Sequence, residues 1–106
     1  MKIPKKIKVV GQEVKVLYPY LFTERTDAHG LACLSTNQIL LAAQSDGEPL
    51  PEAFIAEKFL HEIGHHVAQI VTGEACLGGD EIKHSLICRM LFQVIRDNKL
   101  DFRHGR

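Results

Sequence analysis

The most informative feature of the sequence is a pair of histidines four residues apart, with a glutamate directly after the first: His61-Glu62-Ile63-Gly64-His65. On a helix, side chains four residues apart lie one above the other, so both imidazoles can direct a ring nitrogen at one metal ion. Glu62 is rotated by about 100° from His61, which places its carboxylate beside the metal and within reach of a metal-bound water. This HExxH motif predicts two zinc ligands, His61 and His65, and a general base, Glu62.

The residues around the motif predict the helix that it needs. Residues 52–72 contain no proline, Pro51 suits the first helical turn, and Gly73 can end the helix. Apolar side chains recur at helical spacing and centre roughly opposite the two histidines: Ala56, Phe59, Leu60, Ile63, Val67 and Ile70. We therefore expect one face of this helix to enter the core and the other to form the site.

Three residues in or near the motif receive other interpretations. His66 projects between Glu62 and the apolar stripe, so we expect it to pack or to support the site without binding the ion. Lys58 points toward the ligand side one turn earlier and is interpreted as a solvated lysine. Gly64 costs about 1 kcal/mol relative to alanine inside a helix, and close approach of another backbone would explain it.

The residues before this helix predict a small antiparallel sheet of three to four strands. Segments 7–10 and 13–18 alternate apolar and polar residues around Gly11-Gln12, which suits a type II′ hairpin, and Pro19 interrupts the second strand. Residues 23–30 are predicted as a loop. Segments 31–34 and 38–43 then flank a second predicted turn.

A second long helix is predicted over residues 80–98, after a short loop from Gly73 to Gly79. Its apolar residues form one broad face: Leu86, Ile87, Met90, Leu91, Val94 and Ile95. Asp80 and Glu81 favour the helix N-terminus through the macrodipole. The expected fold is therefore α+β and zincin-like: one domain over residues 1–106, with the sheet packed on the metal-bearing helix and a short extension after residue 98.

A catalytic zinc site normally has three protein ligands and one open position, so the sequence must supply a ligand beyond the two histidines. The start of the second helix offers Asp80, Glu81 and His84. Glu81 has the longer reach of the two acids, and it lies 81 − 65 = 16 residues after His65, which leaves room for the chain to turn back. His84 is the main rival, because imidazole is also a good zinc ligand.

At this point the chain resembles the minimal gluzincin metallopeptidases, small phage- and prophage-encoded HExxH proteins related in plan to the ImmA/IrrE-type peptidases and more distantly to thermolysin. The resemblance spans nearly the whole chain. It is carried by the opening segment 1–9, by Phe59-Leu60-His61-Glu62, and by the closing segment 93–98 with Leu100-Asp101-Phe102. The resemblance implies a sheet against a metal-bearing helix, a zinc ion, peptide-bond hydrolysis, and a glutamate ligand from the following helix, which corresponds to Glu81.

One position departs from the resemblance. These proteins tend to carry an acidic group one turn after the ligand glutamate, where it steadies a zinc-bound histidine, and this chain has Ser85 there. His84 and Ser85 are therefore the candidates for supporting the ligands through hydrogen bonds.

Composition excludes several classes of function. Thirteen basic and thirteen acidic residues give a formal net charge of +0, so a nucleic-acid-binding face is not expected. The basic run near the N-terminus, Lys2, Lys5, Lys6 and Lys8, is interpreted as the solvated edge of a strand. Cys33, Cys76 and Cys88 have neither the number nor the spacing of a disulfide framework or a cysteine zinc knuckle.

No apolar run approaches the ~18 residues of a membrane span, and the charged N-terminus is not followed by the apolar region of a signal peptide. A soluble cytoplasmic protein is expected, in the host cytoplasm if the gene is carried by a phage. The sequence leaves the oligomeric state open.

The leading hypothesis is a zinc metallopeptidase that acts on a peptide or protein substrate, with Glu62 activating water. The alternative is a catalytically inactive zincin-like fold that binds a phage or host protein and keeps the metal as a structural element. A structural zinc is closed by four protein ligands, whereas a catalytic zinc has an open position. For the substrate path, segment 38–43 is the predicted strand nearest in sequence to the metal-bearing helix. It is interpreted either as an exposed edge strand that pairs with an extended peptide or, from its apolar content, as an ordinary core strand.

Overall fold

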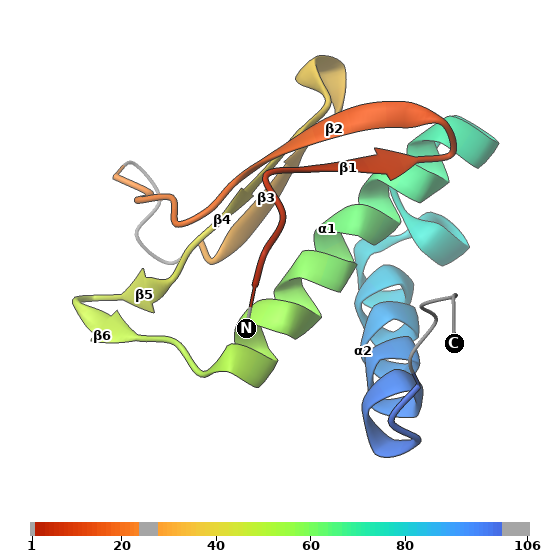
Figure 1. Cartoon of the computed structure of the whole chain (residues 1–106). Helices are drawn as coiled ribbons and strands as arrows, with labels where there is room; N and C mark the ends of the chain where they lie inside the picture. The colour runs from red at the N-terminus through yellow and green to blue at the C-terminus, as the bar shows by residue number, and fades with distance from the viewer. Residues whose placement is uncertain (1, 24–27, 101–106) are drawn as a thin grey trace, which may run out of the picture.

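The structure is a computed structural model that describes residues 2–23 and 28–100, so residues 24–27 of the predicted loop and the predicted extension beyond residue 100 lie outside the described residues. It confirms an α+β fold in which a four-stranded sheet precedes two long helices (Figure 1). The helices are α1 (Glu52–Thr72) and α2 (Glu81–Asp97). The strands are β1 (Lys6–Val9), β2 (Gln12–Leu17), β3 (Gly30–Cys33), β4 (Gln38–Leu41), and the small pair β5 (Gln44–Ser45) and β6 (Glu48–Pro49). Short 3₁₀ turns are η1 (Leu34–Thr36) and η2 (Leu77–Gly79).

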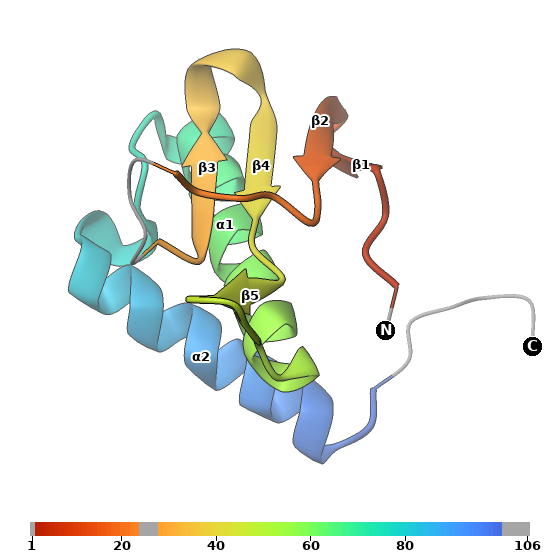
Figure 2. The ribbon, with the colours of Figure 1, turned by 90° about the vertical axis from the view of Figure 1, so that its left-hand side faces the viewer.

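The sheet is mixed, which corrects the antiparallel sheet expected from the sequence. Its strand order is β1-β2-β4-β3, and Figure 2 shows the four strands side by side in this order. The two predicted hairpins form, because β1 pairs antiparallel with β2 and β3 pairs antiparallel with β4. After β2, however, the chain crosses to the far edge before it returns, so that β4 lies parallel to β2. Hairpin signals are local in sequence and do not specify how two hairpins join.

The first hairpin turns one residue earlier than predicted. Val10 and Gly11 both have positive φ, 47° and 81°, as a type I′ turn requires, instead of a type II′ turn at Gly11-Gln12. In the observed register Lys8 lies opposite Glu13, whereas the predicted register would place it opposite Lys15. Opposite charges across a strand pair are favourable and like charges are not, which favours the observed register.

The core lies between the sheet and α1. Val9, Val14 and Ile39 form its buried centre on the sheet side. From α1, four of the six side chains of the predicted apolar stripe pack on this centre: Phe59, Ile63, Val67 and Ile70. The expectation that this stripe enters the core is confirmed for these four residues. In the described part of the chain, no helix is both long and apolar enough to cross a membrane.

Helix α2 packs against α1 at its N-terminal half through small and polar groups. Asp80 caps the helix by accepting a hydrogen bond from the backbone N–H of Lys83 at 2.8 Å. The buried residues of α2 are His84 and Cys88, which face α1. Most of the predicted apolar face is exposed to solvent: Leu86, Ile87, Met90, Leu91 and Val94. The helix was predicted, but its apolar face is not the surface that packs on α1.

Candidate metal centre

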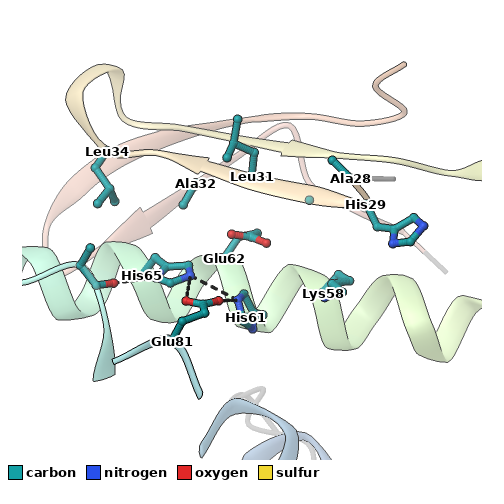
Figure 3. A pocket seen from close by; sticks show the side chains of 12 residues that line it. Ala28, His29, Leu31, Ala32, Leu34, Lys58, His61, Glu62, His65 and Glu81 are labelled. Carbon is teal, nitrogen blue, oxygen red and sulfur yellow. Dashed lines mark hydrogen bonds and ion pairs between the residues drawn. The ribbon is translucent and has the colours of Figure 1, made fainter. Parts of the chain in front are cut away.

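His61, His65 and Glu81 bring three ligand atoms to one point (Figure 3). The two histidines project from α1, and Glu81 reaches them from the first turn of α2. The Nε2 atoms of the histidines are 3.2 Å apart. Glu81 Oε1 lies 2.9 Å from His61 Nε2, and Glu81 Oε2 lies 3.4 Å from His65 Nε2. These are the three residues that were predicted from the sequence as metal ligands.

The spacing of these atoms fits a zinc ion. Zinc bonds to nitrogen and oxygen are about 2.0–2.1 Å long, and a tetrahedral angle between two such bonds separates the ligand atoms by about 3.3 Å. The three observed separations, 3.2, 2.9 and 3.4 Å, join four atoms, because the two histidines contact different oxygens of Glu81, and each of them lies near this value. Two imidazoles and one carboxylate, with the open position of a catalytic site, are also a donor set that zinc accepts.

The chain between the helices orients His65. Gly73 ends α1 in the left-handed conformation, with φ 78°, and turns the chain back toward the site. The carbonyl of Ala75 then accepts a hydrogen bond from His65 Nδ1–H at 2.6 Å. Because this bond holds the proton on Nδ1, it directs the lone pair of Nε2 to the point where the three ligands meet.

His84 supports the ligands and is itself fully hydrogen-bonded. Its Nδ1 accepts from the backbone N–H of Leu77, and its Nε2–H donates to the carbonyl of His61, both at 2.9 Å. Its ring stacks on that of His65, with centroids 3.7 Å apart and planes within 7°. Both ring nitrogens are therefore occupied, which assigns His84 to supporting the site and leaves Glu81 as the better third ligand.

The other candidates lie farther from the centre. Asp80 caps α2 instead of turning toward the histidines. Ser85 is half-buried one turn after Glu81, and within the described residues no hydrogen bond joins it to His61, His65 or Glu81. The sequence offered His84 and Ser85 as candidates for supporting the ligands. Of these two, His84 contacts the ligand residues, through its hydrogen bond to His61 and its stacking on His65.

Gly64 is required by side chains of α2 rather than by another backbone, which corrects the sequence-based explanation. A Cβ at this position would lie 2.8 Å from Cys88 Sγ and 2.9 Å from His84 Cε1. Both α2 residues are buried, and His84 is fixed by its two hydrogen bonds. The glycine therefore lets α2 approach α1 closely enough for Glu81 to reach the histidines.

Glu62 lies next to the ligands but points toward the sheet, as Figure 3 shows. It is 4% exposed, and a Cβ on Gly30 of β3 would lie 2.8 Å from its Oε2. Burial raises the pKa of this carboxyl to about 7, against a smaller opposing effect of His65. A carboxylate with such a pKa can exchange a proton near neutral pH.

Burial and the neighbouring ligand residues shift the pKa values of His61 and Glu81. Burial lowers the pKa of His61, and the neighbouring His65 lowers it further, so a neutral imidazole with a free lone pair is favoured. Desolvation alone would raise the pKa of Glu81, but the nearby His65 and His61 outweigh it and lower that pKa. The two shifts favour a neutral His61 imidazole and an ionised Glu81 carboxylate, the protonation states that a metal requires of these two residues.

Another group of potential ligands, His61, His84 and Cys88, is less suitable. His84 would have to give up its hydrogen bond to the His61 carbonyl. Burial also raises the pKa of the Cys88 thiol to about 11, so it is protonated near neutral pH, whereas zinc binds thiolates.

His66 is a packing residue, as the sequence indicated. It is 2% exposed, and its Nε2–H donates to the carbonyl of Gln38 in β4 at 3.0 Å. This bond ties α1 to the sheet directly behind the site. Lys58 is half-buried, with Nζ 5.7 Å from the ring centre of Phe54, so it is less solvated than predicted.

A cleft of about 400 Å³ lies between the metal-bearing face of α1 and β3. Glu62, His61 and His65 line one wall, and the edge strand β3 lines the other. The prediction that segment 38–43 forms this edge is wrong, because β4 is central and pairs with both β2 and β3. The short apolar run of β3 carried no signal that distinguished it from a central strand.

Protein-family models, curated proteins and solved structures were all compared with the chain, and none matches it.

Proposed function

We propose that the protein is a zinc-dependent metallopeptidase that hydrolyses peptide bonds. The observation that supports this most strongly is the convergence of His61, His65 and Glu81 at tetrahedral spacing, with the Glu62 carboxylate in the same cleft. Within the described residues the group contains three side chains, which favours a catalytic over a structural metal because one coordination position stays open.

The ion would be held by His61, His65 and Glu81. When bound, zinc supplies a Lewis acid that polarises a carbonyl and lowers the pKa of water. Glu62 takes the role of general base: its carboxylate accepts the proton of the attacking water and then delivers it to the leaving amine. Its burial keeps the pKa near 7, so it can perform both steps close to neutral pH.

The substrate in this proposal is an extended peptide or protein segment that pairs with β3. As an edge strand, β3 has one side without a strand partner among the described residues, and β3 lines the cleft together with Glu62. Gly30 lets the carboxylate lie against the strand, since a larger residue would meet Glu62 Oε2 at 2.8 Å. Peptide pairing would therefore present a carbonyl to the metal and the base together.

We also propose a cytoplasmic location. Cys33, Cys76 and Cys88 are all free thiols, and cytosolic proteins keep their cysteines reduced. Nucleic acid is not proposed as a partner, because the net charge is +0. A membrane is not proposed either, because no helix of the described residues is long and apolar enough to cross one.

The test is a comparison of the zinc-loaded parent with Glu62→Gln. The amide cannot accept a proton, so the variant should keep about one zinc per chain and lose cleavage of a peptide library by at least ~100-fold. Zinc content measured in both proteins separates loss of the base from loss of the metal. Cleavage by Glu62→Gln at the parent rate would show that the proposed base is wrong.

A further inference from the structure

Helix α2 carries a large apolar face that the described chain leaves open to solvent. Leu86, Met90 and Val94 are 48%, 51% and 52% exposed. Ile87 on the same face is 38% exposed. In Figures 1 and 2, α2 runs along the outside of the molecule. Its buried residues, His84 and Cys88, lie on another side, against Gly64 of α1. Contiguous exposed apolar surface of this kind marks an interaction site.

The residues of this face form a continuous strip along the helix. At about 100° per residue, six positions fall within roughly 100° of the helix circumference: Lys83, Leu86, Ile87, Met90, Val94 and Asp97. The buried His84 and Cys88 fall outside this sector, as does Glu81. The strip is therefore separate from the α1 contact and from the metal centre.

The two charged residues make the strip self-complementary. Lys83 lies seven residues before Met90, and Asp97 lies seven residues after it. If two copies of α2 cross antiparallel at Met90, Lys83 of each copy meets Asp97 of the other, and Leu86 meets Val94. A parallel pair would instead place lysine against lysine and aspartate against aspartate, which is unfavourable.

We propose that α2 pairs with α2 of a second copy, antiparallel about a two-fold axis at Met90, to form a homodimer. The interface is isologous, so one surface serves both partners. The local ion pairs that it would rearrange are exposed, with Lys83 Nζ 3.9 Å from Asp80 and Arg96 Nε 3.1 Å from Asp97. Such pairs contribute little to stability, so their rearrangement opposes the dimer weakly.

The dimer should be reversible. A helix of 17 residues is about 25 Å long, which gives a contact at the small end of stable protein interfaces. We expect a dissociation constant on the order of micromolar. Because Glu81 lies outside the strip, both clefts remain open, and dimerisation does not depend on the peptidase activity proposed above.

The first test is sedimentation equilibrium of the full chain across the micromolar range. Met90→Glu places two like charges at the axis and should weaken the dimer by at least ~100-fold. Val71→Glu is the matched control, because Val71 is an apolar residue of α1 with 66% exposure, away from the strip. A monomeric parent protein, or equal dissociation of both variants, would overturn the proposal.

The second test addresses the antiparallel direction. Lys83→Glu and Asp97→Lys should each raise the dissociation constant about tenfold, because each converts two attractive contacts into repulsive ones. A mixture of the two variants should recover the parent affinity as a heterodimer. Both changes suit the helix macrodipole, and circular dichroism would verify that the helix is retained. Single variants with the parent affinity would rule out this pairing.

Discussion

Replacing Gly64 with alanine tests how closely the two helices must approach at the site. In an isolated helix the substitution is stabilising, by about 1 kcal/mol, because glycine is a poor helix former. Here the new Cβ would lie 2.8 Å from Cys88 Sγ and 2.9 Å from the His84 ring. Ordinary carbon contacts are about 3.5–4.0 Å, so α2 must move by several tenths of an ångström or more.

The net effect of Gly64→Ala should be to lower the free energy of unfolding. Overpacking a filled site costs about 1–3 kcal/mol, and His84 cannot rotate away without losing its bonds to Leu77 N–H and the His61 carbonyl. Subtracting the gain in helix propensity leaves a net destabilisation of about 1 kcal/mol. Zinc affinity should also fall, because displacement of α2 carries Glu81 away from His61 and His65.

Urea unfolding of the metal-free protein and zinc titration with a competing chelator measure the two effects. Gln69→Ala, at an exposed position of the same helix, is the control and should change stability by less than ~0.5 kcal/mol. Cys88→Ala in the Gly64→Ala background removes the closest contact and should recover part of the loss. If Gly64→Ala instead stabilises the protein by about 1 kcal/mol, the close contact between the helices is wrong.

Three further predictions concern the ligands, the base and the buried thiol. Glu81→Ala should weaken zinc binding by at least ~100-fold in a chelator competition, and His84→Ala should weaken it less; the reverse order would make His84 the ligand. Gly30→Ala should reduce peptide cleavage while zinc content stays unchanged, because its Cβ displaces the Glu62 carboxylate; equal activity would show that the carboxylate does not need this position. The Cys88 thiol, with its pKa raised by burial to about 11, should react with iodoacetamide near neutral pH only after unfolding, and rapid alkylation of the folded protein would contradict its burial.

Local patterns predicted the elements better than their assembly. Periodicity and turn residues predict the helical stripe from Phe59 to Ile70 and the two hairpins. These elements form, with the first hairpin turning one residue earlier than predicted. The parallel pairing of β2 with β4 joins segments far apart in sequence, so no local signal predicted it. For the same reason no local signal distinguishes the edge strand β3 from the central strand β4.

At the site, the motif and helix geometry predicted the metal ligands and the general base, but not the groups that hold them in position. The spacing of His61 and His65 and the position of Glu81 follow from helix geometry and loop length. The carbonyl of Ala75 and the open space at Gly30 are backbone features that depend on the tertiary fold. The apolar residues of α2 predicted a helix face, but the sequence alone did not indicate that His84 and Cys88 would occupy the contact with α1 instead.

Zinc K-edge X-ray absorption of the zinc-loaded protein tests the central claim, that His61, His65 and Glu81 form the metal centre. The expected spectrum has nitrogen and oxygen neighbours at about 2.0–2.1 Å, with the multiple scattering of two imidazoles and without sulfur. The Glu81→Ala protein, if it retains zinc, should lose one oxygen neighbour. A sulfur neighbour at about 2.3 Å would show that a cysteine binds the ion, either Cys88 or Cys76, whose Sγ lies 3.6 Å from Glu81 Oε2, and would contradict the proposed centre.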